Sequence, residues 1–271
     1  PVAQKFGAKS YSEMRKFVMN AAYLAIFLAV IMTIVTCVLC GSILTWMKTP
    51  NQFYQGAYDY LFVIFLGIPF TFLYNVVAGI IRSLGDSKTP FYFLVLSAVM
   101  NIFLDMLFII VFKLGTAGAG WATILSQAIS GVLCFRYMKK KYDILKTNHQ
   151  ERRLDMHYIK TLFTMAVPMG LQFSITAIGS IMLQSANNAL GTACVAAFTS
   201  AMRIKMFFIC PFESLGIAMA TYCGQNYGAG KPKRIWQGIK ASGVMMLIYA
   251  LLTFVVLMVG ARTLALLFVD T

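Results

Sequence analysis

Long runs of apolar residues without charges constrain this chain more than any other feature of its sequence. Seven runs contain about 20 residues or more, the length that a helix needs to cross a bilayer core of roughly 30 Å. Hydrophobic residues make up 59% of the chain and charged residues only 12%, as is typical of membrane proteins. The sequence therefore predicts an all-α integral membrane protein with spans at about 17–44, 60–81, 91–112, 115–135, 162–187, 193–222 and 239–260.

Basic residues are distributed unevenly between the connections on the two sides. One side holds only Lys48, Lys113 and Arg262, whereas the other holds 18 Lys and Arg residues in 1–16, 82–88, 136–160 and 231–240. By the positive-inside rule, the richer side is cytoplasmic. The net charge of +14 therefore reflects membrane topology. We expect no nucleic-acid partner, because the basic residues do not line one face with interleaved aromatic residues.

One short motif occurs twice, 221 residues apart. It reads "QKFGAKSYSEMRK" at Gln4–Lys16 and "QNYGAGKPKRIWQ" at Gln225–Gln237, and a long apolar run follows each copy. An even number of spans separates the copies, so the repeat is parallel, with its axis along the membrane normal. This period implies a parent of about twelve helices in two halves, of which this chain would hold the third to the ninth. Because Pro1 lies in what we interpret as a connecting loop, we expect a partial chain.

Four segments give the sequence its resemblance to a known family. They are "RSLGDSKTP" in a cytoplasmic loop, "NIFLD" in the next helix, "GTAGAGWAT" at the start of the helix after that, and "ESLGIAMATYCGQNYGAG" at the end of the sixth span. In this order they resemble the multidrug and toxic compound extrusion (MATE) family. The resemblance covers essentially the whole chain and implies a transporter of twelve helices, in two lobes that face each other around a central cavity.

The resemblance also implies an activity: a secondary active antiporter that exports organic cations, drugs or toxic metabolites in exchange for sodium or protons. We expect a monomeric, multi-pass protein of the bacterial inner membrane without a cofactor, whose partners are small-molecule substrates and membrane lipid. We expect the amino-terminal lobe at 1–138, a cytoplasmic linker at 139–160 and the carboxy-terminal lobe at 161–271. The linker contains both histidines, but its dense charge favours a solvated connector over a metal site.

Two acids lie inside the predicted spans, Asp105 and Glu213. An ionisable group in hydrocarbon costs at least ~2.5 kcal/mol, so each marks a candidate functional site. Asn101 shares a helix face with Asp105, and Thr123 lies at similar depth in the neighbouring helix. These three groups could bind sodium or form a protonatable cluster, or they could simply join helices by hydrogen bonds. In the MATE family such groups at these motif positions form the cation-coupling site, and Asn75 in "YNVVAG" is a candidate fourth ligand.

The second acid, Glu213, follows Pro211, which should bend the sixth span. Irregular helices of this kind tend to line cavities, so Glu213 and Arg203 are candidates for the substrate cavity of the carboxy-terminal lobe. A structural ion pair between Glu213 and a neighbouring base is the alternative. In the fifth span, Gln172 and Gln184 are candidate substrate contacts, although amides also join helices.

Two other function classes fit the sequence less well. A flippase for lipid-linked oligosaccharides, from the same superfamily, would need a basic cavity for diphosphate, and only Arg203 and Lys205 lie within the spans. An integral membrane enzyme lacks its parts, because the spans contain no histidine, paired-acid motif or HExxH motif. "GTAGAG" at Gly115–Gly120 does not have dinucleotide-binding spacing, and close helix packing explains it better.

Overall fold

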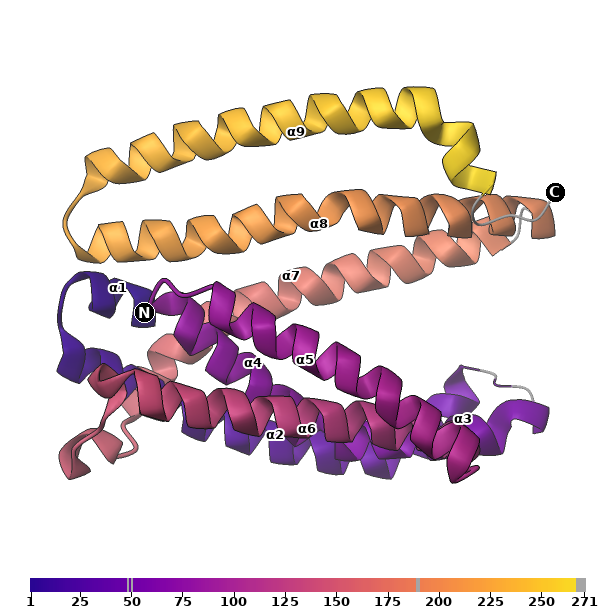
Figure 1. The fold of residues 1–271 in the computed structure, drawn as a ribbon, viewed down its shortest axis with the longest axis horizontal. Helices are drawn as coiled ribbons and strands as arrows, with labels where there is room; N and C mark the ends of the chain where they lie inside the picture. Colours follow the sequence, from indigo (N-terminus) through magenta and orange to yellow (C-terminus); the bar gives the residue numbers. More distant parts are fainter. Residues whose placement is uncertain (48, 50, 189–190, 267–271) are drawn as a thin grey trace. The chain divides into compact units, whose positions relative to one another are not determined.

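The computed structural model describes residues 1–47, 49, 51–188 and 191–266, and these residues form helices without any strand. Six helices are long and apolar enough to cross a membrane, and a bent pair supplies a seventh span (Figure 1). Each predicted span falls within one of these elements, except that the span predicted at 91–112 ends one residue after its element. The α-helices are α1 (Val2–Gly7), α2 (Tyr11–Trp46), α3 (Asn51–Leu66), α4 (Ile68–Ser83), α5 (Lys88–Asp105), α6 (Gly115–Lys141), α7 (Met156–Asn188), α8 (Thr192–Gly228) and α9 (Pro232–Leu266).

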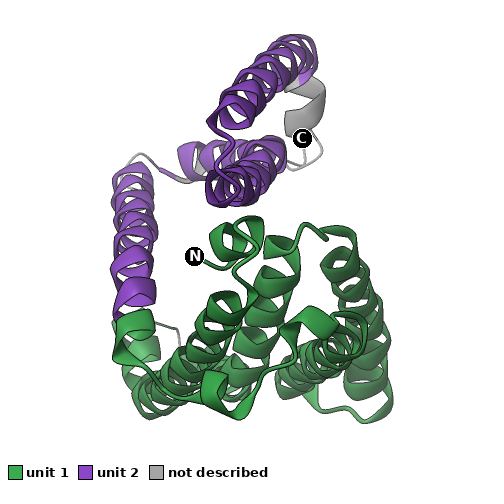
Figure 2. Ribbon diagram, turned by 90° about the vertical axis from the view of Figure 1, so that its left-hand side faces the viewer, with its two compact units in different colours: residues 1–159 green, residues 160–271 purple. Residues whose placement is uncertain are grey.

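The chain divides into two compact units, shown in green and purple in Figure 2. Unit 1 is Pro1–Ile159 and contains α1 to α6 with the first turn of α7. Unit 2 is Lys160–Thr271 and contains the rest of α7 with α8 and α9. The division therefore lies inside α7. Lys48 and part of the turn predicted at 187–191 lie outside the described residues.

The second span differs from the prediction because it consists of two helices. The α3 and α4 helices meet at Gly67 with a bend of 44°. Pro69, in the first turn of α4, has no N–H to continue the hydrogen-bond ladder of α3. A Cβ atom at Gly67 would collide with the side chain of Ile124 from α6. The break therefore occurs where glycine lets a neighbouring helix approach closely.

Helix α6 packs against α3, α4 and α5 and is the central element of unit 1. Gly118 and Gly120 in its first turns are buried, and a Cβ at Gly120 would lie 3.0 Å from Val63 Cγ1 of α3. The "GTAGAG" segment thus serves close helix packing, as predicted. Towards the other end of α6, a core of apolar side chains joins α6 to α2 and α4 through Val18, Val77, Ile80, Ile81, Cys134 and Met138.

The polar segment between α6 and α7 is anchored to α2. Glu151, in the short helix η3 (His149–Arg152), is only 5% exposed. Its two carboxylate oxygens each accept a hydrogen bond of 2.7 Å from the Arg15 guanidinium. This interaction lowers the pKa of the Glu151 carboxyl to about 2, because it stabilises the charged form. The segment expected to be a solvated connector therefore contains a buried ion pair.

A second anchor joins the loop between α4 and α5 to the end of α6. Asp86 in "RSLGDSKTP" accepts hydrogen bonds from the hydroxyls of Thr89 and Tyr142, at 2.7 and 2.5 Å, and from the Lys141 ammonium at 3.1 Å. Burial acts to raise the pKa of Asp86, but the hydrogen bonds from Tyr142, Thr89 and Lys141 outweigh it and hold the pKa well below its ordinary value. Asp86 is therefore ionised, and its carboxylate holds the loop against the end of α6.

The two copies of the repeated motif adopt the same backbone turn. The helices α1 and α8 are each followed two residues later by a left-handed residue, Lys9 at φ 58° and Gly230 at φ 67°. Just before it, the N–H groups of Ala8 and Ala229 each donate to the carbonyl four residues earlier, at 2.9 and 3.0 Å. Such turns are typical helix ends. Positions 221 residues apart therefore share a conformation, and the sequence repeat is also a structural repeat.

In unit 2, α8 and α9 pack side by side (Figure 1). The Tyr222 hydroxyl donates to the Arg234 carbonyl at 3.1 Å near the turn between them. Farther along, the Tyr249 hydroxyl of α9 donates to the Phe208 carbonyl of α8 at 3.1 Å. This carbonyl lies three residues before Pro211, and α8 remains helical from Thr192 to Gly228 through that proline. The Tyr249 hydroxyl thus binds a carbonyl close to the position where proline interrupts the ladder.

Candidate functional site

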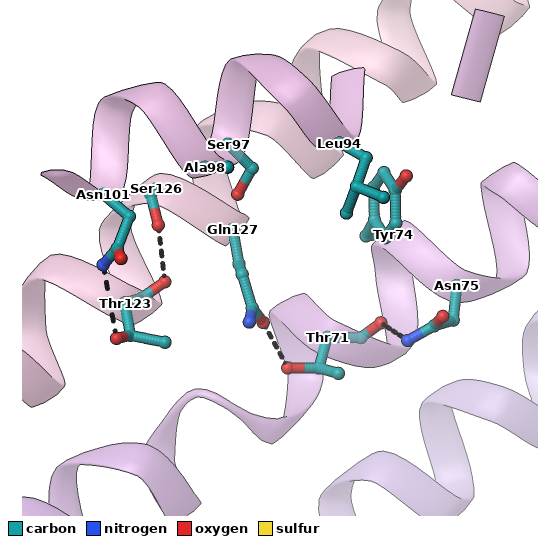
Figure 3. Close-up of a pocket in the computed structure, with 10 residues that line it drawn as sticks. All are labelled: Thr71, Tyr74, Asn75, Leu94, Ser97, Ala98, Asn101, Thr123, Ser126 and Gln127. Atoms are coloured by element: carbon teal, nitrogen blue, oxygen red, sulfur yellow. Dashed lines mark hydrogen bonds between the residues drawn. The ribbon is translucent and has the colours of Figure 1, made fainter. Parts of the chain in front are cut away.

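A pocket of about 330 Å³ lies in unit 1 between α4, α5 and α6 (Figure 3). Eight of its ten lining side chains carry a neutral polar group, and none of the ten is Lys, Arg, Asp or Glu. The pocket therefore offers dipoles rather than charges to a bound molecule or ion. The lining residues are Thr71, Tyr74, Asn75, Leu94, Ser97, Ala98, Asn101, Thr123, Ser126 and Gln127.

Three of the four residues predicted for cation coupling meet in this pocket. Asn75 comes from α4, Asn101 from α5 and Thr123 from α6. Asn101 Nδ2 donates a long hydrogen bond of 3.4 Å to Thr123 Oγ1, drawn in Figure 3. The structure thus brings together the Asn101 amide and the Thr123 hydroxyl, which were predicted to lie at similar depth in neighbouring helices.

The hydrogen bonds of these side chains point their donors at protein oxygens. Thr123 Oγ1 donates to the Ala119 carbonyl at 3.0 Å, and Asn75 Nδ2 donates to the Thr71 carbonyl at 2.8 Å. With Asn101 Nδ2 also engaged, both asparagines retain Oδ1 lone pairs for a ligand. Oxygen acceptors suit hard cations. The residues present therefore fit a small cation such as sodium better than an anion.

Asp105, the fourth predicted residue, lies beside the pocket and does not line it. It is the last residue of α5, one turn or about 6 Å beyond Asn101 along the helix axis. A π-helical segment, η1 (Met106–Val111), begins immediately after it. Asp105 Oδ1 is buried without a hydrogen-bond partner in the structure. An unpaired buried carboxylate oxygen is costly, and π-helical turns often occur at functional sites, so both features single out this acid.

Sequence reasoning missed several polar residues of the pocket, although a signal for them exists. Three of the missed polar residues form i, i+4 pairs with predicted ones, so each pair lies on one helix face. Thr71 precedes Asn75 on α4, Ser97 precedes Asn101 on α5, and Gln127 follows Thr123 on α6. On α5 the series continues to Asp105. Three polar stripes at this spacing, in three consecutive predicted spans, would have indicated the pocket.

The residues predicted for a substrate cavity lie on α7 and α8. Glu213 and Arg203 are exposed on α8, Gln172 is exposed on α7, and Gln184 is half-buried on α7. Within the described residues, Glu213 forms no ion pair with Arg203 or Lys205. These bases are ten and eight residues before Glu213, or about 15 and 12 Å along α8, which is far for a direct contact on one helix. The alternative of a structural ion pair with one of these bases therefore has no support among the described residues.

Comparison with known proteins identifies the family. The MatE family model matches residues 1–107 and 165–271, two segments that contain the two copies of the repeated motif. The chain is 34% identical over 193 residues to YpnP, a probable multidrug resistance protein of Bacillus subtilis, covering 71% of this chain and 43% of that protein. It is 28% identical over 246 residues to YoeA of the same bacterium, covering 88% and 53%. The chain spans about half the length of these curated relatives.

Solved MATE structures have the same fold. A crystal structure of MATE in the bent conformation has a TM-score of 0.92 at 25% identity, covering 98% of this chain and 60% of that chain. A MOP superfamily transporter from Pyrococcus furiosus has a TM-score of 0.92 at 24% identity, covering 100% and 60%. These matches confirm the predicted all-α membrane fold. With its membrane-spanning helices and its family match, the chain belongs to the MATE family of multi-pass membrane transporters.

Proposed function

We propose that the complete protein is an antiporter of the cell membrane that exports organic cations, drugs or toxic metabolites in exchange for sodium or protons. YpnP, YoeA and the NorM protein of Thermotoga maritima are each named probable multidrug resistance proteins, which supports this substrate class. Residues 1–138 and 161–271 would belong to the two lobes and 139–160 to their linker. The division into compact units next to residue 160 supports that assignment.

The single observation that carries the coupling proposal is the juxtaposition of a neutral oxygen pocket with a partly buried acid. Asn75, Asn101 and Thr123 supply neutral oxygens, and Asp105 supplies a charge one turn away. A carboxylate can be neutralised by a proton or balanced by a sodium ion, so the two cations compete for one group. Coupling follows if the bound cation favours one orientation of the lobes, because a ligand that binds both states equally shifts nothing.

A flippase for lipid-linked oligosaccharides fits this pocket less well. Its substrate carries a diphosphate, which needs cationic or hydrogen-bond-donating groups. The ten lining residues of the unit 1 pocket include no Lys or Arg to balance that charge. The proposal therefore favours a cation as the ligand of this pocket.

The test uses Asp105→Asn in the complete protein, reconstituted in liposomes at matched protein density. Asparagine keeps the shape and one oxygen ligand but removes the charge. We expect the variant to insert normally, while export driven by a sodium or proton gradient falls to the rate seen without a gradient. Full gradient-driven export by Asp105→Asn would overturn the assignment and leave Asp105 as a packing residue.

A matched control is Asp59→Asn in α3. Asp59 accepts a hydrogen bond of 2.8 Å from the Gln55 side chain of its own helix and is absent from the pocket. Export by this variant should respond to both gradients as the unsubstituted protein does. The comparison separates the loss of a coupling charge from the general effect of neutralising an acid.

A further inference from the structure

The α4 wall of the pocket is joined to α6 by a hydrogen bond that the coupling proposal does not use. Thr71 Oγ1 of α4 donates to Gln127 Oε1 of α6 at 2.6 Å, across 56 residues of sequence (Figure 3). We propose that Thr71 and Gln127 are positioning residues of the cation site, which hold α4 and α6 at the spacing that lets Asn75 and Thr123 share one pocket. This inference rests on the proposed function of that pocket.

Helix α4 needs such a contact because it begins at a break. The backbone turns by 44° at Gly67, four residues before Thr71, so α4 is not held in line by α3. On the α6 side, Ile124 packs where a Cβ of Gly67 would lie. That contact is apolar and fixes the approach of the helices, but not their rotation or slide. A directional hydrogen bond one turn further along supplies this restraint.

The bond lies next to both ligands. Thr71 and Asn75 are one turn apart on α4, as are Thr123 and Gln127 on α6, so about 6 Å of helix separates each ligand from the bond. Asn75 also hydrogen bonds to the Thr71 carbonyl, which ties its side chain to the same turn. Gln127 Oε1 accepts from Thr71, so its amide joins α6 to α4 directly beside the two ligands.

The test removes each partner with little change in shape, in the complete protein reconstituted in liposomes. Thr71→Val and Gln127→Leu should each raise the cation concentration that gives half-maximal export about tenfold, the effect of one lost hydrogen bond, with an unchanged maximal rate. The double variant should be no worse than either single variant, because both remove the same bond. Thr71→Ser, which keeps the hydroxyl, should restore the affinity for the cation.

Export is measured in two parallel assays, one driven by a sodium gradient at fixed pH and one driven by a pH gradient without sodium. The half-maximal concentration is determined for whichever cation drives export. Thr36→Val is the matched control, because the Thr36 hydroxyl bonds only to carbonyls of its own helix, α2. The inference is overturned if Thr71→Val and Gln127→Leu leave the half-maximal concentration unchanged, if their effects add in the double variant, or if Thr71→Ser behaves like Thr71→Val.

Asn101→Ala distinguishes a failure of this inference from a failure of the proposed function. If Asn101→Ala weakens cation dependence and Thr71→Val does not, the pocket binds the cation and only the positioning role falls. If neither substitution changes cation dependence, the pocket is not the coupling site and both proposals fall. Gln127→Leu provides an independent reading should Thr71→Val not insert into the membrane, because it breaks the same bond from α6.

Discussion

The two units of this chain share a helical turn and differ in how they place their polar side chains. Lys9 in unit 1 and Gly230 in unit 2 have the same left-handed conformation, 221 residues apart. Polar residues from three helices of unit 1 converge on one pocket beside Asp105. Among the described residues, unit 2 comprises three helices, α7 to α9, and the candidate substrate residues Glu213 and Arg203 lie on α8.

The proposed functions assign the driving cation to unit 1 and contacts with the substrate to unit 2. A small cation needs several oxygens at short distance, and unit 1 can supply them from its own helices. A large and variable organic substrate needs contacts along a wide wall, and Glu213 and Gln172 are the contacts proposed for it. We therefore expect substitutions in unit 1 to alter the dependence on the driving cation, and those in unit 2 to alter the choice of substrate.

Neutralising Glu213 tests the role proposed for unit 2. This substitution should have the largest effect on substrate choice. Glu213→Gln should weaken export of cationic compounds much more than export of neutral ones, because the carboxylate attracts positive charge, and its response to the driving gradient should persist. Export of a cationic and a neutral dye from liposomes measures both. Equal loss for the two dyes would indicate a structural role for Glu213 and break the comparison.

Breaking the anchor of the connector should cost unit 1 about 3 kcal/mol of unfolding free energy, because loss of Arg15 or Glu151 leaves the other partner buried and unpaired. Thermal unfolding of Glu151→Gln in detergent measures this loss of stability.

The same ion pair should make the stability of unit 1 depend on pH. The pKa of the Glu151 carboxyl falls from its ordinary value of 4.5 to about 2 in the folded protein. The stabilisation from Glu151 is therefore complete above about pH 4.5 and is lost as the pH falls towards 2. Glu151→Gln should remove that part of the acid sensitivity.

Glu13→Gln is the matched control for the anchor. Glu13 pairs with Lys5, but both side chains are well exposed, so this pair should contribute less than about 1 kcal/mol. Similar losses of thermal stability in Glu13→Gln and Glu151→Gln would show that the connector is not anchored by its buried pair.

Removing one neutral ligand should have a smaller effect on unit 1. Asn101→Ala and Thr123→Ala should each raise the cation concentration for half-maximal export about tenfold, with gradient-driven export retained at high cation concentration. A titration of export rate against the driving cation measures the shift. Gln172→Ala in unit 2 should leave that concentration unchanged, and a shift as large as that of Asn101→Ala would contradict the division between the units.

The shared turn gives the smallest expected effect and tests the repeat itself. Lys9 occupies a left-handed conformation that costs a residue with a side chain roughly 1 kcal/mol, and Gly230 avoids this cost. Lys9→Gly should therefore raise the free energy of unfolding by up to about 1 kcal/mol, and Gly230→Lys should lower it by a similar amount. Changes of the same sign in thermal unfolding would show that the two turns are not equivalent.

The sequence was sufficient to predict the spans and three residues of the pocket. Uncharged runs of sufficient length can only be membrane helices, and Asn101 and Thr123 were found because an intramembrane acid drew attention to them. Thr71 and Gln127 were missed because neutral polar residues cost little in a span and give no strong signal alone. The anchor between Arg15 and Glu151 was also missed, because its partners are 136 residues apart and no local pattern joins them.

The central claim is that unit 1 binds the coupling cation through the pocket and Asp105. Binding of sodium-22 to the purified complete protein, with proton release recorded in parallel, tests it most directly. The account predicts that Asp105→Asn abolishes cation binding, that Asn101→Ala weakens it about tenfold, and that Glu213→Gln leaves it unchanged. Undiminished cation binding by Asp105→Asn, together with loss of binding in Glu213→Gln, would place the coupling site in unit 2 and contradict the account.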